Sequence, residues 1–402
     1  MNGKQTAVKT SVLIGAAFTF MTGWFGGGWA SGQLALKYAG RWGWVGLFGP
    51  LIGAVFITMV AMWICIEYCR LNDVWNYGDF MERFYGHKVF KIIFDIIQYI
   101  TLPISFSGMM ATFSSTLCNY VGGNYWVWNV LFAVIVIACV MWGTQVLNRI
   151  STVMGLGILA LLIIFFGFTI GKGYGSNVGE ILSNKTIFAT DSVWEALSGS
   201  ATSLYMLTAG MALSVMPCFE AVQTRKDVTK TCLFALLFSG IFLFVCSFNV
   251  LSFMPEAGEQ EVPLLYAAQT MKNKVLIVVY VIVVLLAVVS TGSAMCTGYS
   301  RRFMAFNFVE KMKASDTVKM VVISFIIIAV SMFIAAFGIT KIFFAGFDFI
   351  SRLNAPMVSI GVPVVGIIKL VQIKRRGLSL ERGSLANIGS WSMFKKEAKE
   401  SE

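Results

Sequence analysis

Long runs of apolar residues, separated by short polar segments, make up most of the chain. Ten of these runs reach the roughly 20 residues that a helix needs to cross a bilayer. The first run is broken by glycines and lacks a small-residue cleavage site, so we expect no signal peptide. The pattern predicts an all-α, polytopic membrane protein with ten transmembrane helices, spans one to ten, at residues 8–38, 45–69, 89–120, 126–144, 150–171, 193–223, 229–254, 275–300, 318–338 and 342–371.

The composition excludes a soluble enzyme. Hydrophobic residues make up 57% of the 402 positions and charged residues 13%, against about 25% charged in a soluble domain. The eight cysteines lie in apolar runs without metal-ligand spacing, and His87 is the one histidine of the sequence. We therefore expect neither an enzyme nor a cofactor-binding protein.

The positions of the basic residues predict the orientation. With the N-terminus in the cytoplasm, 23 of the 31 basic residues fall in inner segments, seven in outer segments and one, Arg352, within a span. Cytoplasmic segments carry this excess in membrane proteins. We expect a bacterial cytoplasmic membrane protein with both termini inside. The net charge of +11 then reflects the bilayer rather than nucleic acid.

The spacing of the runs indicates a repeat. Spans one to five can be shifted onto spans six to ten by about 185 residues, with the last two pairs shifted slightly more. Because five is odd, the second copy enters the membrane from the opposite side, which is typical of secondary transporters. The prediction is one transporter domain, residues 1–372, built from repeats 8–171 and 193–371, and a basic cytoplasmic tail, residues 373–402.

Both repeats begin with an interrupted span. Residues 23–32 contain five glycines, and span six carries Gly210 and Pro217. Irregular backbone at membrane depth occurs where it is buried in protein or lines a cavity. The alternative is close packing of continuous helices through small residues.

Broken helices offer partial charges to a ligand. We expect free N–H groups near Ala30 to Gly32 and free carbonyl groups near Leu207 to Gly210, which together suit a zwitterion. Aromatic side chains nearby would shape the pocket or stack on an amine, although such residues also serve as packing. The predicted substrate-binding residues are Gly26, Gly27, Gly28, Trp29, Ala30, Ser31, Phe106, Tyr205, Thr208, Ala209 and Gly210.

Residues 26–33 read Gly-Gly-Gly-Trp-Ala-Ser-Gly-Gln. This segment resembles the Gly-x-Gly-[Phe/Trp]-Ala-Ser-Gly-Gln pattern of bacterial permeases similar to YkvI, which are LeuT-fold transporters of the amino acid–polyamine–organocation superfamily. Leu34 follows, where many relatives have an acidic residue. The resemblance implies a LeuT fold over about residues 8–371, with spans one, two, six and seven rocking against spans three, four, eight and nine.

The same resemblance implies an ion site. Relatives that use sodium hold it between carbonyls of span one and an Ala-x-x-[Ser/Thr]-[Ser/Thr] pattern of span eight, which Ala287, Ser290 and Thr291 match. These hydroxyls would otherwise bond to neighbouring helices. Some proton-coupled relatives carry a lysine in span five instead, and residues 150–171 contain none. Sodium is the expected coupling ion.

Charges inside span ten suggest a gate. In relatives, an acidic residue of span ten closes an outer gate against a basic residue of span one, which makes Lys37 and Asp348 the candidate pair. Arg352, four residues after Asp348, is the alternative partner on the same helix.

The sequence thus predicts a secondary active transporter that moves a small amino-acid-like or amine solute by alternating access, coupled to sodium. The alternatives are a proton-coupled transporter, an exporter of another small solute, or an ion channel. A channel would need polar stripes or charged rings, which the spans lack. The expected partners are the solute and the lipid bilayer; the oligomeric state stays open.

Overall fold

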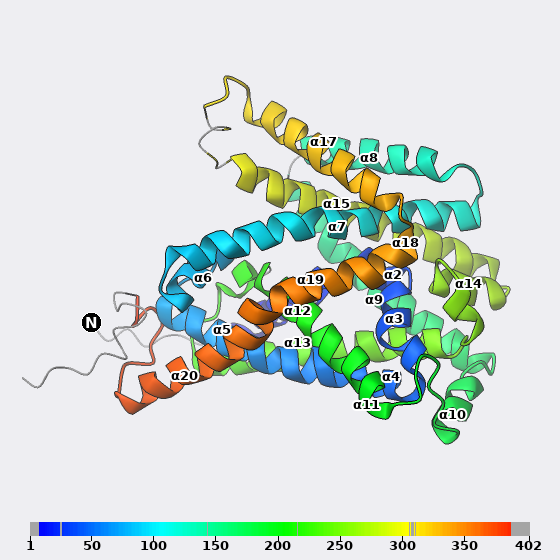
Figure 1. The fold of residues 1–402 in the computed structure, drawn as a ribbon, viewed down its shortest axis with the longest axis horizontal. Helices are drawn as coiled ribbons and strands as arrows, with labels where there is room; N and C mark the ends of the chain where they lie inside the picture. The colour runs from blue at the N-terminus through cyan, green and yellow to red at the C-terminus, as the bar shows by residue number, and fades with distance from the viewer. Residues whose placement is uncertain are drawn as a thin grey trace, which may run out of the picture.

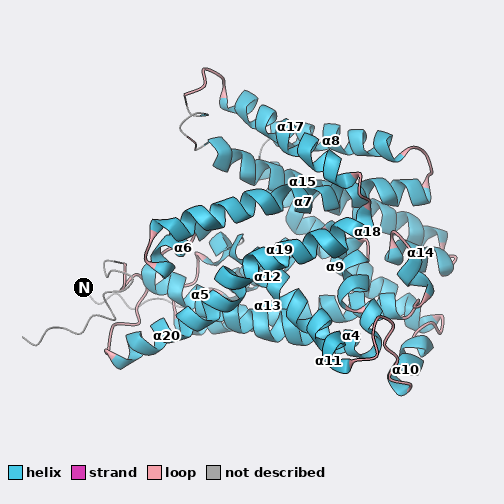
Figure 2. Ribbon diagram, in the orientation of Figure 1, coloured by secondary structure: helices cyan, strands magenta, loops and turns pink. Residues whose placement is uncertain are grey.

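The computed structural model describes residues 8–24, 26–142, 144–214, 216–304, 306, 309 and 311–386. The elements formed by these residues are helices (Figure 2). The first half of the chain contains α1 (Thr10–Trp24), α2 (Gly27–Ala30), α3 (Gln33–Tyr38), η1 (Gly40–Trp42), α4 (Gly43–Pro50), η2 (Leu51–Ile57), α5 (Thr58–Asn72), α6 (Tyr77–Tyr85), α7 (Lys88–Tyr120), α8 (Tyr125–Trp142), α9 (Thr144–Gly171) and α10 (Ser176–Ser183).

The second half of the chain continues in the same way. It contains α11 (Val193–Leu197), η3 (Ser198–Thr202), α12 (Ser203–Ser214), η4 (Met216–Phe219), α13 (Arg225–Leu251), η5 (Glu256–Glu259), α14 (Pro263–Thr270), α15 (Lys274–Met304), α17 (Asp316–Ala335), α18 (Ile339–Lys341), η6 (Ile342–Gly346), α19 (Phe347–Asn354), η7 (Ala355–Ile360) and α20 (Gly361–Arg375). Helices therefore occupy all ten predicted stretches, and span ten runs a few residues further at each end than predicted.

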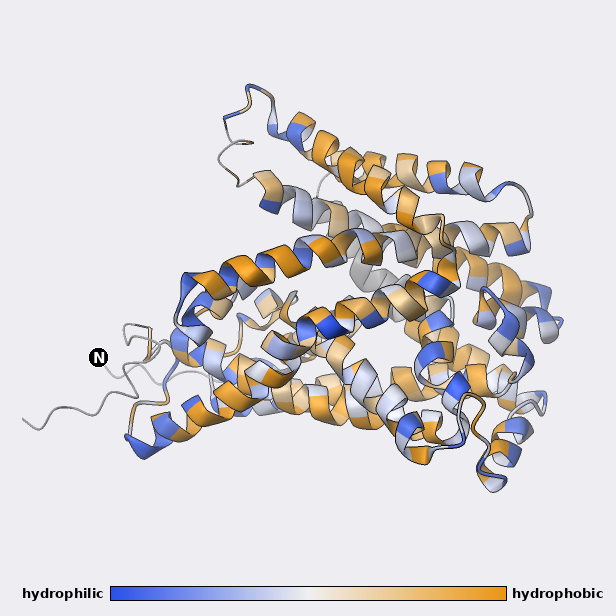
Figure 3. Cartoon of the chain, viewed as in Figure 1, coloured by the Kyte–Doolittle hydropathy of each residue, from blue (hydrophilic) through white to orange (hydrophobic). Residues whose placement is uncertain are grey.

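Within the described residues, six helical segments are long and apolar enough to cross a membrane, or seven if the bent pair α9 and α10 counts as one span. The apolar parts of α1 and α8 are shorter. Large apolar side chains cover the outside of these helices: Phe333 of α17 is 79% exposed and Val275 of α15 is 72% exposed. Figure 3 shows that hydrophobic residues dominate the long helices and that hydrophilic residues gather toward their ends. Apolar exposure of this extent suits lipid rather than water.

The long helices pack in two groups (Figure 1). One group contains α1, α5, α12, α13, α19 and α20, and the other contains α7, α8, α15 and α17. The helix α9 packs on members of both, α13 and α15. We call the end of the molecule that carries α6 and residues 376–386 the basic end; α10 and α14 lie at the opposite end (Figure 1).

The segment after α20 is fixed to the basic end. The backbone N–H groups of Gly383 and Leu385 donate to the carbonyl groups of Arg70 and Leu71, the latter two in the last turn of α5. Arg382 pairs with Asp73 at 2.7 Å. Partial burial raises the pKa of the Asp73 carboxyl, but hydrogen bonds from Arg382 and Trp75 outweigh this and leave the pKa below its usual value. Residues 387–402 of the predicted tail lie outside the described residues.

Span one is interrupted, as predicted. The helix α1 ends at Trp24, a single turn follows at Gly27–Ala30, and a new helix begins at Gln33 after Gly32, whose φ is 88°. Only glycine adopts this left-handed conformation at little cost. Phe25 lies outside the described residues.

The break depends on close backbone contacts with spans eight and ten. A Cβ atom on Gly27 would lie 2.3 Å from Cγ1 of Val288 in α15, and one on Gly28 would lie 2.5 Å from Cε1 of Phe343 in η6. Real Cβ atoms do not approach other atoms this closely. The glycines at these positions therefore allow the unwound backbone of span one to lie against its neighbours.

These contacts predict the effect of one added methyl group. Gly27→Ala forces its Cβ against Val288, whose β-branched side chain has little rotamer freedom, at a cost of about 1–3 kcal/mol. We expect a lower melting temperature in detergent, with partial recovery in Gly27→Ala/Val288→Ala. Gly167→Ala is the control, since no atom lies within 4 Å of that added Cβ. A Gly27→Ala protein as stable as the parent would contradict this packing.

Candidate substrate site

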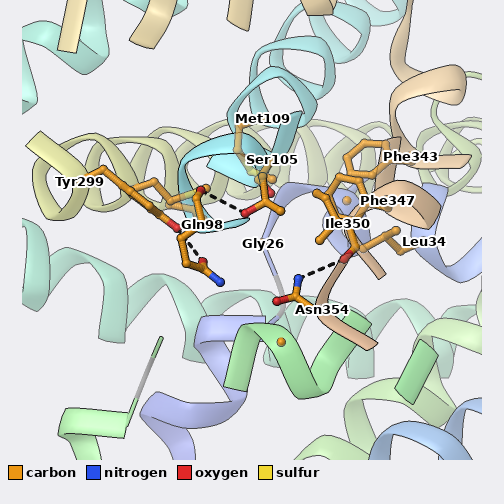
Figure 4. A pocket seen from close by; sticks show the side chains of 15 residues that line it. Gly26, Leu34, Gln98, Ser105, Met109, Tyr299, Phe343, Phe347, Ile350 and Asn354 are labelled. Atoms are coloured by element: carbon orange, nitrogen blue, oxygen red, sulfur yellow. Dashed lines mark hydrogen bonds between the residues drawn. The ribbon is translucent and has the colours of Figure 1, made fainter. Parts of the chain in front are cut away.

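A cavity of about 150 Å³ lies at the break of span one, between the two helix groups (Figure 4). It is lined by residues from five spans: Gly26, Gly28, Leu34, Gln98, Thr101, Ser105, Met109, Gly210, Thr291, Met295, Tyr299, Phe343, Phe347, Ile350 and Asn354. Pockets between helices of bundles are common ligand sites, and this one meets the unwound backbone of span one.

Two helix faces extend the cavity along the axes of α7 and α15. On α7 the lining residues Gln98, Thr101 and Ser105 are spaced by three and four residues, which places them on one face. The 11 helical steps from Gln98 to Met109 correspond to about 16 Å of helix. Because α7 starts at the basic end, Gln98 lies nearest that end. On α15, Tyr299 lies opposite and donates to Oε1 of Gln98 at 3.1 Å. The cavity thus runs from the break toward the basic end.

The other end of the cavity is closed by buried apolar side chains. Phe343 is 0% exposed, Phe347 1% and Leu34 3%. The two phenylalanine rings pack with centroids 4.9 Å apart. Figure 4 shows these three side chains together on one side of Gly26, with Tyr299 and Gln98 on the other.

Lys37 and Asp348 lie directly beyond this apolar layer. The Nζ atom of Lys37 is 2.5 Å from Oδ1 of Asp348 and donates to the carbonyl groups of Phe343 and Phe344 at 3.0 and 2.8 Å. Lys37 is 5% exposed, so its charge depends on these partners. The structure brings the two predicted gate residues together; Arg352 is exposed and is absent from the ion pairs among the described residues.

The acceptors for Lys37 come from an irregular turn of span ten. Residues Ile342–Gly346 form a π-helix, and a second π-helix, Ala355–Ile360, follows Asn354. Such segments appear frequently at functional sites within helices. Span ten therefore changes its helix type on both sides of α19, which carries the lining residues Phe347, Ile350 and Asn354.

The free backbone N–H and carbonyl groups that the sequence predicted at the two breaks are not free at the predicted residues. The N–H groups of Ala30, Ser31 and Gly32 donate to carbonyl groups of residues 26, 27 and 29, so they are not free. The helix α12 continues through Leu207–Gly210 to Ser214, which moves the free carbonyl end of this helix to about residues 211–214. Gly210 and Ala209 do not break the helix because interhelix packing tolerates small residues inside it.

Of the predicted substrate-binding residues, Gly26, Gly28 and Gly210 line the cavity and Gly27 lies beside it. The others have structural contacts instead. Trp29 stacks on Tyr38, Phe106 packs on Phe132, and the Tyr205 hydroxyl donates to the carbonyl of Ser359. Those three, with Ala30, Ser31, Thr208 and Ala209, are not among the residues that line the cavity.

Of the predicted ion-site residues, Thr291 lies against span one, which it meets through its methyl carbon. Thr291 lines the cavity, and its Cγ2 atom would lie 3.2 Å from a Cβ atom built on Gly26. Ala287 and Ser290 are buried, 2% and 4% exposed, within the same two turns of α15. Nearby, the Tyr280 hydroxyl donates to the carbonyl of Ala30 at 2.7 Å, which also fixes span one to α15.

Sequence reasoning missed these lining residues: Leu34, Gln98, Thr101, Ser105, Met109, Met295, Tyr299, Phe343, Phe347, Ile350 and Asn354. A signal was present for some of them. Gln98, Thr101 and Ser105 form a polar line on an otherwise apolar helix, and Thr291, Met295 and Tyr299 repeat every four residues. A polar line on a buried span indicates a water-filled or ligand-filled surface.

No protein-family model matches the sequence, and no curated protein matches it either. Solved structures do match. Inward-facing Mhp1 gives a TM-score of 0.59 at 13% identity, over 94% of this chain and 81% of that one. MhsT in complex with L-phenylalanine gives 0.53 at 16% identity, over 98% of both chains. A Na⁺-coupled sialic acid symporter gives 0.51 at 15% identity, over 95% of both chains. The chain therefore has the LeuT fold of these transporters, with span one broken at the cavity.

Proposed function

We propose that the chain is a secondary active transporter that moves a small amino-acid-like or amine solute across the bacterial cytoplasmic membrane by alternating access. One observation carries the proposal: a cavity at unwound backbone between two helix groups, closed at one end by packed phenylalanines and an ion pair. A cavity of this kind suits a solute that enters from one side at a time. The similarity of residues 26–33 to YkvI-like permeases supports the same class.

With the basic end in the cytoplasm, as the basic residues predict, the structure corresponds to an inward-facing state. The cavity then runs toward the cytoplasm, and Phe343, Phe347 and the Lys37–Asp348 pair close the outer side. An outward-facing state would require span ten to separate from Lys37, and the π-helical turns offer places for that movement.

We further propose sodium as the coupling ion. Neutral hydroxyl and carbonyl oxygens suit a weakly held Na⁺. Thr291 lies beside Gly26 of span one, and Ser290 is the buried residue directly before it. The symporter among the structural neighbours is described as Na⁺-coupled, which agrees with this choice. A proton-coupled mechanism and export are the alternatives.

Uptake into proteoliposomes tests the function and the ion. We expect a panel of amino acids and amines to include a solute whose uptake requires an inward Na⁺ gradient and persists without a pH gradient. Ser290→Ala and Thr291→Ala should each raise the Na⁺ concentration for half-maximal uptake at least about tenfold, because each removes one oxygen ligand. Thr291→Ser retains the hydroxyl and serves as the control. If uptake by both alanine variants depends on Na⁺ as in the parent, Ser290 and Thr291 are not sodium ligands. If a pH gradient alone drives uptake, the coupling ion is the proton rather than Na⁺.

Charge exchange tests the gate. Lys37→Met leaves Asp348 without its cation and should destabilise the closed outer side by about 2 kcal/mol, or roughly thirtyfold in population. We expect slower uptake from either single variant, Lys37→Asp or Asp348→Lys, and partial recovery in the double variant. Recovery stays partial because an aspartate cannot donate to the carbonyl groups of Phe343 and Phe344. A double variant no better than the single ones would contradict the pairing as a gate.

A further inference from the structure

The side chains that line the cavity carry no formal charge at neutral pH. The polar members are Gln98, Thr101, Ser105, Thr291, Tyr299 and Asn354, and the remaining members are glycine or apolar. The residues that fall outside the described part of the chain at the two breaks, Phe25 and Val215, are also uncharged. A ligand with a net charge would lose its hydration here without gaining an opposite charge.

Charged residues beyond the two ends of the cavity form ion pairs. Lys37 pairs with Asp348 at the closed end. Toward the basic end, Asp95 of α7 pairs with Arg302 of α15, and Lys91 pairs with Asp79 at 3.0 Å. Each of these pairs holds both signs of charge in one place, so these three pairs add no net charge that would favour a cation or an anion in the cavity. Arg352 lies outside these pairs and is exposed.

Asn354 contributes the one buried acceptor of the cavity that has no hydrogen-bond partner among the described residues. Its side chain is 2% exposed, and its Nδ2 atom donates to the carbonyl of Ile350 at 3.0 Å. This contact fixes the orientation of the Asn354 amide. With the amide reversed, Oδ1 would face the carbonyl oxygen of Ile350, and two acceptors cannot form a hydrogen bond. The Oδ1 atom is the unpartnered one, and Figure 4 shows it turned away from Ile350.

The position of Asn354 depends on Gly210 of α12. A Cβ atom on Gly210 would lie 2.6 Å from Cγ of Asn354, so a larger residue would displace the amide. Leaving a buried acceptor without a partner costs about 1–3 kcal/mol. A ligand that donates a hydrogen bond to Oδ1 would recover this energy. Phe343, Phe347, Ile350 and Leu34 provide an apolar surface on the same side of the cavity.

We propose that the cavity selects a net-neutral solute that combines an apolar group with an N–H or O–H donor, and that Asn354 determines this choice by accepting the donor at Oδ1. The inference rests on the proposed function and narrows its solute class: zwitterions and uncharged amides fit, whereas amines that stay cationic do not. Two properties together would select such a solute. The side chains that line the cavity are uncharged, and Asn354 Oδ1 is a buried acceptor without a hydrogen-bond partner among the described residues.

Four compounds with one phenylethyl skeleton test the inference. They are L-phenylalanine, which is zwitterionic, 3-phenylpropanamide, which is uncharged, phenethylamine, which is a cation, and 3-phenylpropanoate, which is an anion. Binding to the full-length protein in detergent is measured by calorimetry, and uptake is measured separately in proteoliposomes. We expect the two net-neutral compounds to bind at least about tenfold more tightly than either ion. Tighter binding of the cation or anion, or binding of none of the four, would overturn the inference.

Variants of Asn354 test the residue itself. Asn354→Leu, similar in size, should weaken binding of the net-neutral compounds about tenfold, and Asn354→Asp should shift preference toward phenethylamine. Asn119→Leu is the matched control: Asn119 also donates to the carbonyl four residues earlier, at 2.8 Å, but does not line the cavity. If both Asn354 variants keep the parent's preference, Asn354 is not the determinant. The compound series on the parent protein tests the inference even if a variant fails to fold.

The two readouts separate the inference from the proposed function. Binding of the net-neutral compounds without uptake of any solute in the panel would support the proposed selectivity and contradict transport. Uptake of phenethylamine in preference to 3-phenylpropanamide would support transport and contradict the proposed selectivity.

Discussion

The structure depends on the close approach of the span one backbone to three other spans. At Gly26, Gly27 and Gly28 the chain lies against Thr291 and Val288 of span eight, Met109 of span three and Phe343 of span ten. A side chain at these positions would separate the helices by more than the packing tolerates. The absence of Cβ atoms therefore creates the cavity as well as the break, because the unwound residues form part of its wall.

The same approach connects the cavity to its closed end. Leu34 and Lys37 follow the break on the short helix α3, so the position of that helix sets both the apolar layer and the ion pair. Span ten supplies the partners of both residues. Phe343 and Phe347 complete the apolar layer with Leu34, and Asp348 and two backbone carbonyl groups bind Lys37. A charge buried to this degree in a membrane protein requires such partners. Opening this closed end of the cavity would mean separating all of these contacts together.

The sequence was informative where composition dominates. Apolar runs predicted the ten helical stretches because lipid requires them, and five glycines in ten residues predicted the break of span one because helices disfavour glycine. The prediction for span six was less accurate. The sequence predicted a break at Gly210, but α12 continues to Ser214. The glycine instead makes room for the side chain of Asn354.

The lining of the cavity could be predicted only in part. Trp29, Phe106 and Tyr205 are chemically suitable, but rotation of each helix about its axis turns them into packing contacts, and a single sequence carries little information on that rotation. Asn354 was missed because it lies in span ten beside π-helical turns, which shift the helical phase relative to the regular 3.6-residue repeat. Lys37 and Asp348 were paired in advance from the resemblance to transporters that close an outer gate between spans one and ten, and the structure places the two side chains in contact.

We propose that the unwound part of span one borders a solute site that is open to one side of the membrane. Labelling of Ser105→Cys, in a background without native cysteines, tests this proposal, since Ser105 lines the cavity on the basic-end side of the phenylalanine layer. We expect a membrane-impermeant thiol reagent to modify this cysteine from the basic end, and a bound solute to protect it. Failure of the reagent to react from the basic end, or equal reaction from both ends with no protection by solute, would show that no such one-sided site exists.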